Sequence, residues 1–186
     1  VKKCIETSKY LCGLDLHFLD SHEVKNTTYD HSIVSHEPLG VIVSVLPWNF
    51  PAWQGFRAFF PNMLAGNVIL LKHSEVTPTT GDLLQSYFAQ AGLGDFFVHR
   101  LFPHEMTEKI IADPRVGGVS ITGSVKAGQI ISSLCGQYLK KCLLELGGSD
   151  PSIILPDADF KKACQTIARS RLQNAGQVCI SAKRAF

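Results

Sequence analysis

The sequence predicts an α/β fold with an open, doubly wound parallel sheet, and two observations carry this prediction. Between residues 40 and 155, short apolar runs alternate with longer helix-like segments, and turn residues separate them. The apolar runs are nearly continuous, which is typical of parallel strands covered by helices on both faces. Because single helices separate the runs, the connections are expected to be right-handed crossovers within one sheet.

The expected strands follow from the apolar runs that end at turn residues. They are Gly40–Leu46, Asn67–Lys72, Phe96–Phe102, Val116–Ile121, Leu143–Leu146 and Ser152–Leu155. These runs contain several of the β-branched and aromatic side chains that favour strands. They are also far too short to cross a membrane, so they are expected to form the interior of a globular domain.

The segments between these runs are expected to form helices. They are Trp53–Leu64, Pro78–Ala91, His104–Ala112, Lys126–Tyr138 and Asp159–Leu172. Thr77 before Pro78 is a typical N-cap followed by a first-turn proline, and Asp157 and Asp159 favour the positive end of the last helix. Pro61 is expected to bend or end its helix, because proline lacks the N–H that continues the hydrogen-bond ladder.

The N-terminal part of the chain departs from this alternation. Ile5 and Leu11 favour an amphipathic helix within residues 1–23, although Gly13 is a weak helix former. Residues 24–39 combine β formers with alternating polar residues, which is typical of an exposed hairpin or an edge ribbon.

Composition and charge exclude several classes of protein. Hydrophobic residues make up 45% and charged residues 18% of the 186 residues, and no apolar run has the length of a membrane span. The net charge is only +2, and lysine and arginine do not gather into a basic stripe. We therefore expect neither a nucleic acid nor a membrane as a partner.

The cysteines and histidines give no metal-binding motif. The six cysteines lack CxxC spacing, and the seven histidines lack HExxH spacing. We therefore expect no metal site. Because the cysteines also lack the density of a secreted disulfide framework, we expect a reducing compartment, the cytoplasm.

Two motifs follow the first two expected strands, at the edge where parallel sheets bind ligands. PWNFP, residues 47–51, presents the Asn49 amide, which either donates to a developing oxyanion or only braces the loop. KHSE, residues 72–75, offers Lys72 and Glu75, which either hold ribose hydroxyls or form the solvated end of a strand. Both interpretations stay open for each motif.

A glycine-serine turn follows the fourth expected strand and opens a helix. In ITGSVKAG, residues 121–128, Gly123 and Ser124 offer free N–H groups and a hydroxyl at a helix N-terminus. Such a turn binds an anion such as pyrophosphate, or it simply caps the helix.

A carboxylate and a thiol complete the chemical motifs. Glu145 ends the apolar run of LLELGG, and a carboxylate that emerges from buried surroundings suits a general base that activates water. The alternative is an ion pair with Lys140 or Lys141. In NAGQVC, residues 174–179, Cys179 is either a nucleophile in a polar turn or an inert small side chain.

These motifs occur in order on one doubly wound framework. A single reaction that uses all of them explains this better than a series of coincidences. Through GVIVSVLPWNFP, KKCLLELGGSDPSIIL and NAGQVCISAKR, the chain resembles the aldehyde dehydrogenase family, and most of all its succinate-semialdehyde branch. The resemblance runs from about residue 37 to the C-terminus. It implies a Rossmann-like cofactor domain in residues 40–146 and the first part of a second, α/β catalytic domain in residues 147–186.

The resemblance implies oxidation of an aldehyde, in particular succinate semialdehyde, to the carboxylate with NAD or NADP. Cys179 would attack the aldehyde, and the Asn49 amide and the Cys179 N–H would hold the oxyanion. Glu145 would activate the water that hydrolyses the thioester. NAD is the expected cofactor because the Glu75 carboxylate would repel a 2′-phosphate, while NADP stays open.

The resemblance also assigns residues to the cofactor. They are Trp48, Lys72, Glu75, Gly123, Ser124, Gly128 and Gly147. Lys72 and Glu75 would bind the adenosine ribose, and Gly123 and Ser124 would hold the pyrophosphate. Trp48 would line the cleft. Gly128 would allow close packing of its helix, and Gly147 would leave room at the nicotinamide end.

Members of the family are longer at both ends, so the resemblance implies that this chain is the front part of an enzyme. We expect little or no turnover from it alone, and a homo-oligomer when complete. One alternative is a non-catalytic module that binds a nucleotide or another subunit. Another is an acylating dehydrogenase that passes the thioester to coenzyme A, although Glu145 argues against it.

Overall fold

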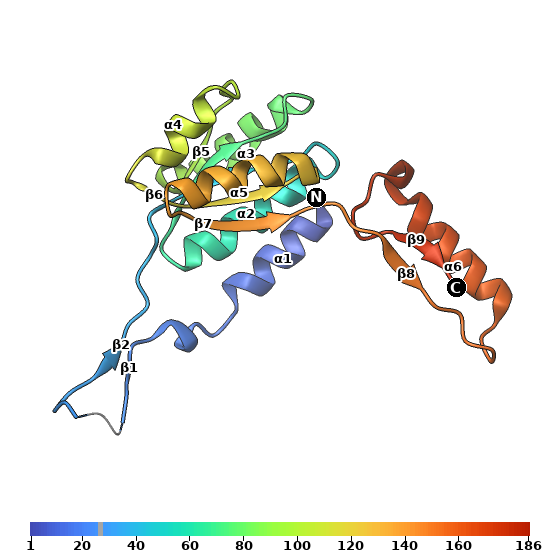
Figure 1. Cartoon of the computed structure of the whole chain (residues 1–186), viewed down its shortest axis with the longest axis horizontal. Helices are drawn as coiled ribbons and strands as arrows, with labels where there is room; N and C mark the ends of the chain where they lie inside the picture. The colour runs from blue at the N-terminus through green and yellow to red at the C-terminus, as the bar shows by residue number, and fades with distance from the viewer. Residues whose placement is uncertain (26–27) are drawn as a thin grey trace.

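The computed structural model describes residues 1–25 and 28–186. Its main body is built on a parallel five-stranded sheet with the order β5-β4-β3-β6-β7 (Figure 1). The strands are β3 (Val41–Val45), β4 (Val68–Lys72), β5 (Phe97–His99), β6 (Val116–Thr122) and β7 (Lys141–Glu145). The chain proceeds outward from β3 to β5 and then returns to β6 beside β3. The predicted doubly wound sheet is therefore confirmed.

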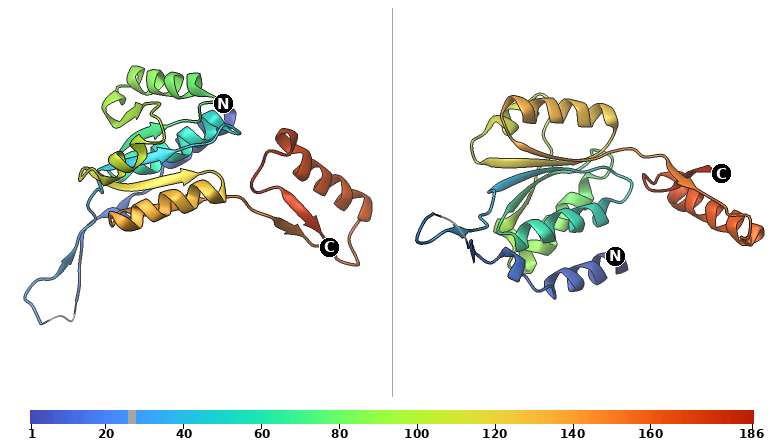
Figure 2. Two further views of the ribbon diagram at one scale, coloured as in Figure 1. Left: turned by 45° about the horizontal axis from the view of Figure 1, so that its top comes forward. Right: turned by 60° about the horizontal axis from the view of Figure 1, so that its bottom comes forward.

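Helices cover both faces of this sheet (Figure 2). They are α2 (Pro51–Leu64) and α3 (Pro78–Gln90) on one face, and α4 (Met106–Ala112) and α5 (Val125–Gln137) on the other. A short 3₁₀ turn, η2 (Gly94–Phe96), precedes β5. Successive residues of a strand point to opposite faces, so Ile42 packs with Phe59 under α2 while Val43 packs with Ile131 under α5. The two apolar cores fix the ends of the strands from both sides.

The N-terminal helix α1 (Lys2–Cys12) packs on α2 and buries Cys4. A 3₁₀ turn, η1 (His17–Leu19), leads to an antiparallel pair formed by β1 (His22–Glu23) and β2 (Ile33–Val34). The pair projects from the body (Figure 1), and β2 lies within the predicted ribbon, whereas β1 lies wholly before it. Residues 26–27 of the predicted ribbon lie outside the described residues.

The C-terminal part forms a separate β-α-β unit beside the body (Figures 1 and 2). It consists of β8 (Asp150–Ser152), α6 (Phe160–Leu172), η3 (Gln173–Gly176) and β9 (Ala182–Ala185). β8 and β9 pair in parallel, and α6 packs against β9. The strand expected at residues 152–155 lies earlier, and β9 was not expected. A domain boundary at residue 147 stays a prediction.

The helix boundaries test three expectations about local sequence. Asp159 caps α6 as expected, because its side chain accepts from the Lys162 N–H at 3.0 Å. Thr77 lies at the cap position of α3, but its hydroxyl bonds the His73 ring at 3.1 Å and does not cap the helix. Pro61 does not end α2, which continues to Leu64 since the Pro61 carbonyl still accepts from the Ala65 N–H at 3.1 Å.

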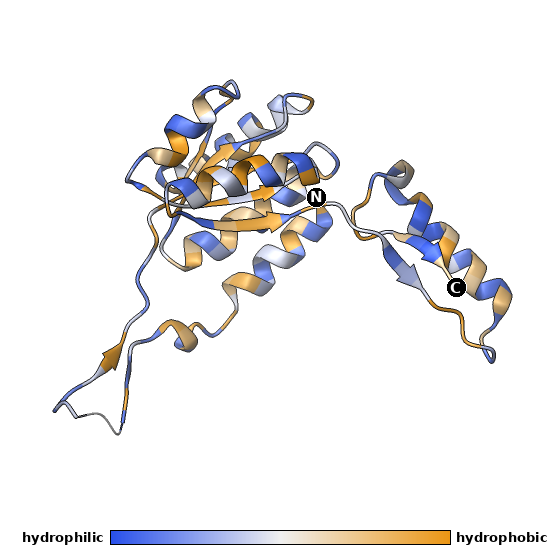
Figure 3. Ribbon diagram, in the orientation of Figure 1, coloured by the Kyte–Doolittle hydropathy of each residue, from blue (hydrophilic) through white to orange (hydrophobic). Residues whose placement is uncertain are grey.

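Apolar surface is exposed on β2 and on the edge strand β7, where Figure 3 shows strong hydrophobic colour. Ile33 of β2 is 68% exposed and Leu143 of β7 is 58% exposed. Across the described ranges 1–25 and 28–186, no helix combines the length and the apolar character needed to cross a membrane.

Candidate active site

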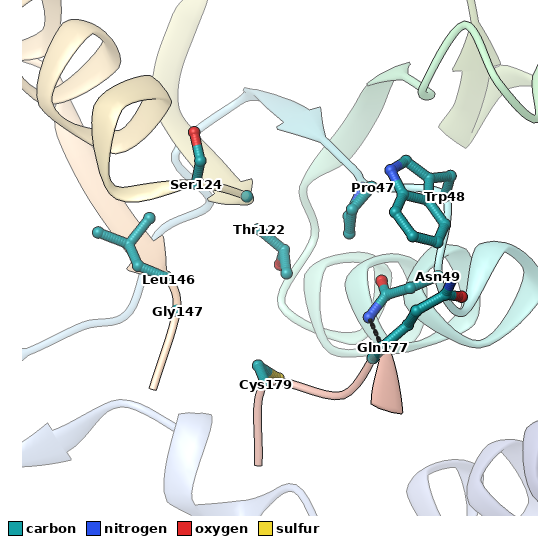
Figure 4. A pocket seen from close by; sticks show the side chains of 10 residues that line it. Pro47, Trp48, Asn49, Thr122, Ser124, Leu146, Gly147, Gln177 and Cys179 are labelled. Atoms are coloured by element: carbon teal, nitrogen blue, oxygen red, sulfur yellow. Dashed lines mark hydrogen bonds between the residues drawn. The ribbon is translucent and has the colours of Figure 1, made fainter. Parts of the chain in front are cut away.

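A cavity of about 390 Å³ lies at the carboxyl ends of β3, β6 and β7, where the order of the sheet reverses (Figure 4). Its lining residues are Pro47, Trp48, Asn49, Thr122, Gly123, Ser124, Leu146, Gly147, Gln177 and Cys179. This is the place where open α/β sheets bind ligands, because the loops that follow neighbouring strands on the two sides of the reversal diverge there. Most of the residues predicted for catalysis or cofactor binding meet in this cavity.

Four separate parts of the chain supply those predicted residues. Trp48 and Asn49 come from the loop after β3, and Gly123 and Ser124 come from the turn after β6. Gly147 follows β7, and Cys179 lies on the loop between η3 and β9. In Figure 4, Cys179 lies on the same side as Asn49 and Gln177, while Ser124 lies across the cavity from them.

The Asn49 amide joins the body to the cysteine loop. Its Nδ2 donates to the Gln177 carbonyl at 2.8 Å, and the Asn174 Nδ2 donates to the Asn49 carbonyl at 2.9 Å. Asn49 therefore does brace the loop, as one of its two interpretations predicts. An asparagine amide has two N–H donors, so one remains for an oxyanion. The partners Asn174 and Gln177 were missed, although both stand in the NAGQVC motif.

The backbone before Cys179 adopts an uncommon conformation. Asn174, Ala175 and Gly176 all have left-handed backbone angles, with φ of 50°, 56° and 78°. For alanine this conformation costs about 1–2 kcal/mol, so the rest of the loop must hold it. Buried Val178 and Ser181 flank the cysteine, and the Ser181 hydroxyl donates to the Val178 carbonyl at 3.0 Å. The strain and these anchors present the thiol to the cavity.

Lys183 ties the cysteine loop to the turn after β7. Its ammonium donates to the Cys179 carbonyl at 2.6 Å and to the Gly148 carbonyl at 2.7 Å. Arg184 adds a hydrogen bond to the Ser149 carbonyl at 3.0 Å. These two cations follow Cys179 by four and five residues in the sequence. Their contacts show that they organise the backbone near Cys179.

Glu145 is paired with Arg57, which was not foreseen. The Arg57 Nη2 lies 2.7 Å from the Glu145 Oε1, and the two side chains are 44% and 45% exposed. The expected buried surroundings of Glu145 are therefore wrong, because β7 is an edge strand. The alternative pairing with lysine is also wrong. Lys140 donates to the carbonyls of Asp113 and Val116 at 3.0 and 2.7 Å, and the ion-pair partner of Glu145 is Arg57.

The N-terminus of α5 opens into the cavity. The Ser124 hydroxyl caps this helix by accepting from the Ala127 N–H at 3.2 Å, as the capping interpretation of the glycine-serine turn predicts. The Gly123 N–H donates to the Glu145 carbonyl at 3.0 Å. A Cβ at Gly128 would come within 2.6 Å of Leu146, so only glycine lets α5 approach the end of β7 this closely.

Lys72 and Glu75 lie together at the end of β4, outside the residues that line the cavity. Their charged groups are 3.8 Å apart, and the Lys72 side chain is 8% exposed while that of Glu75 is 68% exposed. The neighbouring His73 is fully buried, and this burial lowers its pKa. Its ring accepts from the Ser74 N–H at 2.9 Å, so its Nε2 donates to the Pro51 carbonyl at 3.2 Å. The end of β4 is thereby linked to the start of α2.

The donors at this edge fit a nicotinamide dinucleotide. The N-terminus of α5 has the free N–H groups and the positive dipole end that favour a diphosphate. Trp48 is 41% exposed and offers an apolar wall. Lys72 and Glu75 lie beside the neighbouring strand, where an acidic residue commonly binds ribose hydroxyls.

Comparison with known proteins identifies the family. The model of the aldehyde dehydrogenase family matches residues 1–186. This chain belongs to the aldehyde dehydrogenase family. The NADP(+) succinate-semialdehyde dehydrogenase of Deinococcus radiodurans is 46% identical over 152 residues, which cover 81% of this chain and 32% of that protein. A probable NADP(+) succinate-semialdehyde dehydrogenase of Synechocystis is 40% identical, over 99% of this chain and 40% of its own length.

Solved structures of aldehyde dehydrogenases show the same fold. Succinic semialdehyde dehydrogenase from Streptococcus pyogenes, in complex with NADP+, has a TM-score of 0.83 and 36% identity, over 98% of this chain and 39% of its own. Lactaldehyde dehydrogenase from Escherichia coli has a TM-score of 0.90 and 32% identity, over 99% of this chain and 39% of its own. The chain thus spans about a third to two fifths of the length of these relatives.

A second cavity of this aldehyde dehydrogenase chain shares Asn49 and Cys179 with the first and has a volume of about 440 Å³. It lies between α1, α2 and the cysteine loop, and Arg57 and Lys3 bring positive charge to it. Lys3 makes a cation–π contact, since its ammonium lies 4.0 Å from the centre of the Trp53 ring. Arg57 thus contributes to this cavity and also holds Glu145.

Proposed function

We propose that the protein carrying this sequence oxidises an aldehyde to a carboxylate with a nicotinamide dinucleotide as cofactor. The observation that carries the proposal is the meeting of Cys179, the Asn49 amide and the N-terminus of α5 in one cavity at the reversal of the sheet. A thiol, a hydrogen-bond donor and an anion site are the groups that such a reaction needs.

In this proposal the Cys179 sulfur, as the thiolate, attacks the aldehyde carbon. The backbone N–H of Cys179 and the second N–H of the Asn49 amide hold the resulting oxyanion. When bound, a nicotinamide dinucleotide would supply the acceptor for the hydride that leaves the aldehyde carbon, and the acyl group would then remain on Cys179 as a thioester. Glu145 then takes a proton from the water that attacks the thioester carbon, and the thiolate leaves.

We propose NADP+ as the preferred cofactor, with NAD+ as the alternative. The relatives from Deinococcus radiodurans and Synechocystis carry NADP(+) in their names, and the structure from Streptococcus pyogenes contains NADP+. The carboxylate of Glu75 would repel a 2′-phosphate, but the Lys72 ammonium 3.8 Å away partly neutralises it. The expectation of NAD from the sequence rested on that carboxylate alone.

We propose succinate semialdehyde as the substrate, because its distal carboxylate matches a cation near the thiol. Arg57 lines the cavity that it shares with Cys179 and already holds a carboxylate, that of Glu145. A guanidinium binds carboxylates well because its five donors lie in one plane. The names of the relatives above support the same substrate class.

Steady-state kinetics test these proposals. The complete protein that carries this sequence is expected to reduce NADP+ with succinate semialdehyde on the order of once per second or faster. The 186-residue chain alone is expected to be much slower. Cys179→Ser should lower the rate by about 10³-fold or more. Equal rates for the variant and the parent protein would contradict the role of the thiol.

The exposed ribbon favours a further property, self-association. Ile33 and Val34 of β2 are 68% and 41% exposed, and an open apolar strand edge is a site at which chains pair. We propose that the complete protein is a homo-oligomer. Light scattering that gives the mass of a single chain would contradict this.

A further inference from the structure

The ion pair between Arg57 and Glu145 joins two groups with different tasks in the proposed reaction. Arg57 lies on α2 and lines the cavity that contains Cys179, Phe50 and Trp53. Glu145 ends β7 and lines neither of the two cavities that contain Cys179. In this structure the carboxylate proposed as the base is therefore paired with the cation proposed for the substrate, and it lies outside the linings of both cavities.

We infer that Arg57 keeps Glu145 in a resting position and that the carboxylate of the substrate replaces Glu145 on Arg57, which frees the base. This inference rests on the proposed function. It makes Arg57 a positioning residue for Glu145 as well as a substrate contact. Hydrolysis of the thioester is then coupled to the presence of an anionic substrate.

The exposure of the pair makes this exchange feasible. Both side chains are about half-exposed, and an ion pair in contact with water contributes little to stability, so a competing carboxylate can replace it. The contact between Arg57 Nη2 and Glu145 Oε1 at 2.7 Å uses only part of the guanidinium, so a second carboxylate can bind before the first leaves. Two carboxylates on one guanidinium repel each other, which favours departure of Glu145.

The backbone around Glu145 permits a side-chain movement without unfolding of β7. Glu145 is paired with Thr122 in the sheet, and its carbonyl accepts from the Gly123 N–H at 3.0 Å. These bonds hold the main chain while leaving the side chain free to rotate. Gly147, two residues later, has open space where a Cβ would be. The carboxylate can therefore leave Arg57 while the backbone of Glu145 stays in place.

The exchange has a chemical consequence that can be measured. Once Glu145 is free, the oxygen of water bonds to the thioester carbon and the water proton goes to the Glu145 carboxylate. The carbon–sulfur bond breaks, and its electron pair returns to the Cys179 sulfur. With a neutral acyl group on Cys179, Arg57 keeps Glu145 and this step is slow. A small free carboxylate should then accelerate it.

Hydrolysis of p-nitrophenyl acetate tests the inference without any cofactor. The ester acylates Cys179 and releases p-nitrophenolate in a burst, and the steady rate that follows reports thioester hydrolysis. In the complete wild-type protein, added propionate is expected to raise the steady rate several-fold with saturation. In Arg57→Met the steady rate is expected to be high already and insensitive to propionate. A steady rate that propionate leaves unchanged in the wild-type protein would overturn the inference, and this measurement needs no variant.

Two control variants separate positioning from structure. Glu145→Gln should keep the burst but show a slow steady rate that propionate does not change. Arg115→Met removes a guanidinium that pairs with Asp113 at 2.7 Å, far from the thiol in the sequence, and should behave like the wild-type protein. If Arg57→Met melts at the wild-type temperature but hydrolyses the neutral thioester no faster than the wild-type protein, the inference is wrong.

The aldehyde reaction distinguishes failure of the inference from failure of the proposed function. Arg57→Met should raise the KM for succinate semialdehyde by about tenfold or more while raising kcat for butanal. If neither aldehyde reduces NADP+ or NAD+ although the steady rate of ester hydrolysis responds to propionate, the proposed function is wrong and the exchange stands. If both aldehydes react and Arg57→Met lowers kcat for both equally, the proposed function stands and the exchange is wrong.

Discussion

The five-stranded body and the C-terminal unit hold their functional groups by different means. In the body, Phe59 and Phe97 are fully buried, and the apolar cores on both faces of the sheet fix the loops after β3 and β6. In the C-terminal unit, Phe160 and Ile153 are 70% and 73% exposed, and the cysteine loop is held by polar contacts from Asn49 and other residues. The cofactor side of the site depends on packing, whereas the nucleophile depends on a few hydrogen bonds.

A pair of phenylalanine substitutions gives the largest expected difference between the two regions. Phe59→Ala removes a side chain with no exposed surface and should lower the free energy of unfolding by about 3–5 kcal/mol. Phe160→Ala should change it by less than about 0.5 kcal/mol, because that ring already lies in water. Urea unfolding of the 186-residue chain measures both. Similar losses in the two variants would remove the contrast between the regions.

Loss of the Lys183 ammonium is the next largest expected effect. Lys183→Met removes two hydrogen bonds from a charged donor, to the carbonyls of Cys179 and Gly148. Bonds of this kind contribute about 1.5–3 kcal/mol each, and less when water reaches them. Hydrogen exchange of the amides around residues 147–182 should therefore become at least about tenfold faster, while that of β3 stays the same.

Lys161→Met is the matched control, because it removes an exposed lysine from α6 of the same unit. It should leave hydrogen exchange of the cysteine loop unchanged. The same acceleration in Lys161→Met as in Lys183→Met would show that general charge, and not the two carbonyl contacts, holds the loop.

Substitution of Ala175 is expected to have a smaller effect of opposite sign. Ala175 has a φ of 56°, which glycine adopts at little cost, so Ala175→Gly should stabilise the C-terminal unit by up to about 1 kcal/mol. Ala168→Gly, in the right-handed backbone of α6, should destabilise it by about 1 kcal/mol. Thermal unfolding followed by circular dichroism measures both. Destabilisation by Ala175→Gly would argue against strain at this position.

The pH dependence of the body provides the finest test. Burial lowers the pKa of His73 below its ordinary value of 6.5, so the unfolded chain binds more protons than the folded chain below that pH. The free energy of unfolding should therefore fall as the pH drops below 6.5. His73→Gln should weaken this dependence, and His104→Gln, at an exposed site, should not. Equal slopes in His73→Gln and the parent chain would contradict the assignment.

The sequence predicts the body better than the C-terminal unit for a physical reason. The runs GVIVSVL and NVILLK are apolar because both faces of their strands are covered, and that burial leaves a local pattern. β9 has the polar sequence AKRA and pairs with β8 alone among the described strands, so its sequence contains no apolar pattern that would predict a strand. Periodicity could therefore reveal β3 and β4 but not β9.

The candidate site shows the same limit at the level of side chains. The motifs placed Asn49, Ser124 and Cys179 in one cavity because each follows a strand or stands in a polar turn. The pairing of Arg57 with Glu145 joins residues on separate elements, and no local pattern encodes a contact of that range. The surroundings of Glu145 could not be predicted from its apolar neighbours, since β7 is an edge strand and the Glu145 side chain is half-exposed there.

Mass spectrometry of a trapped intermediate tests the central claim most directly. Glu145→Gln in the complete protein should form the thioester and fail to hydrolyse it when succinate semialdehyde and NADP+ are added. The peptide that contains Cys179 should then carry a succinyl group, and Cys179→Ser in the same background should carry none. An unmodified Cys179 peptide, after NADPH has been formed in an amount equal to the enzyme, would contradict the account.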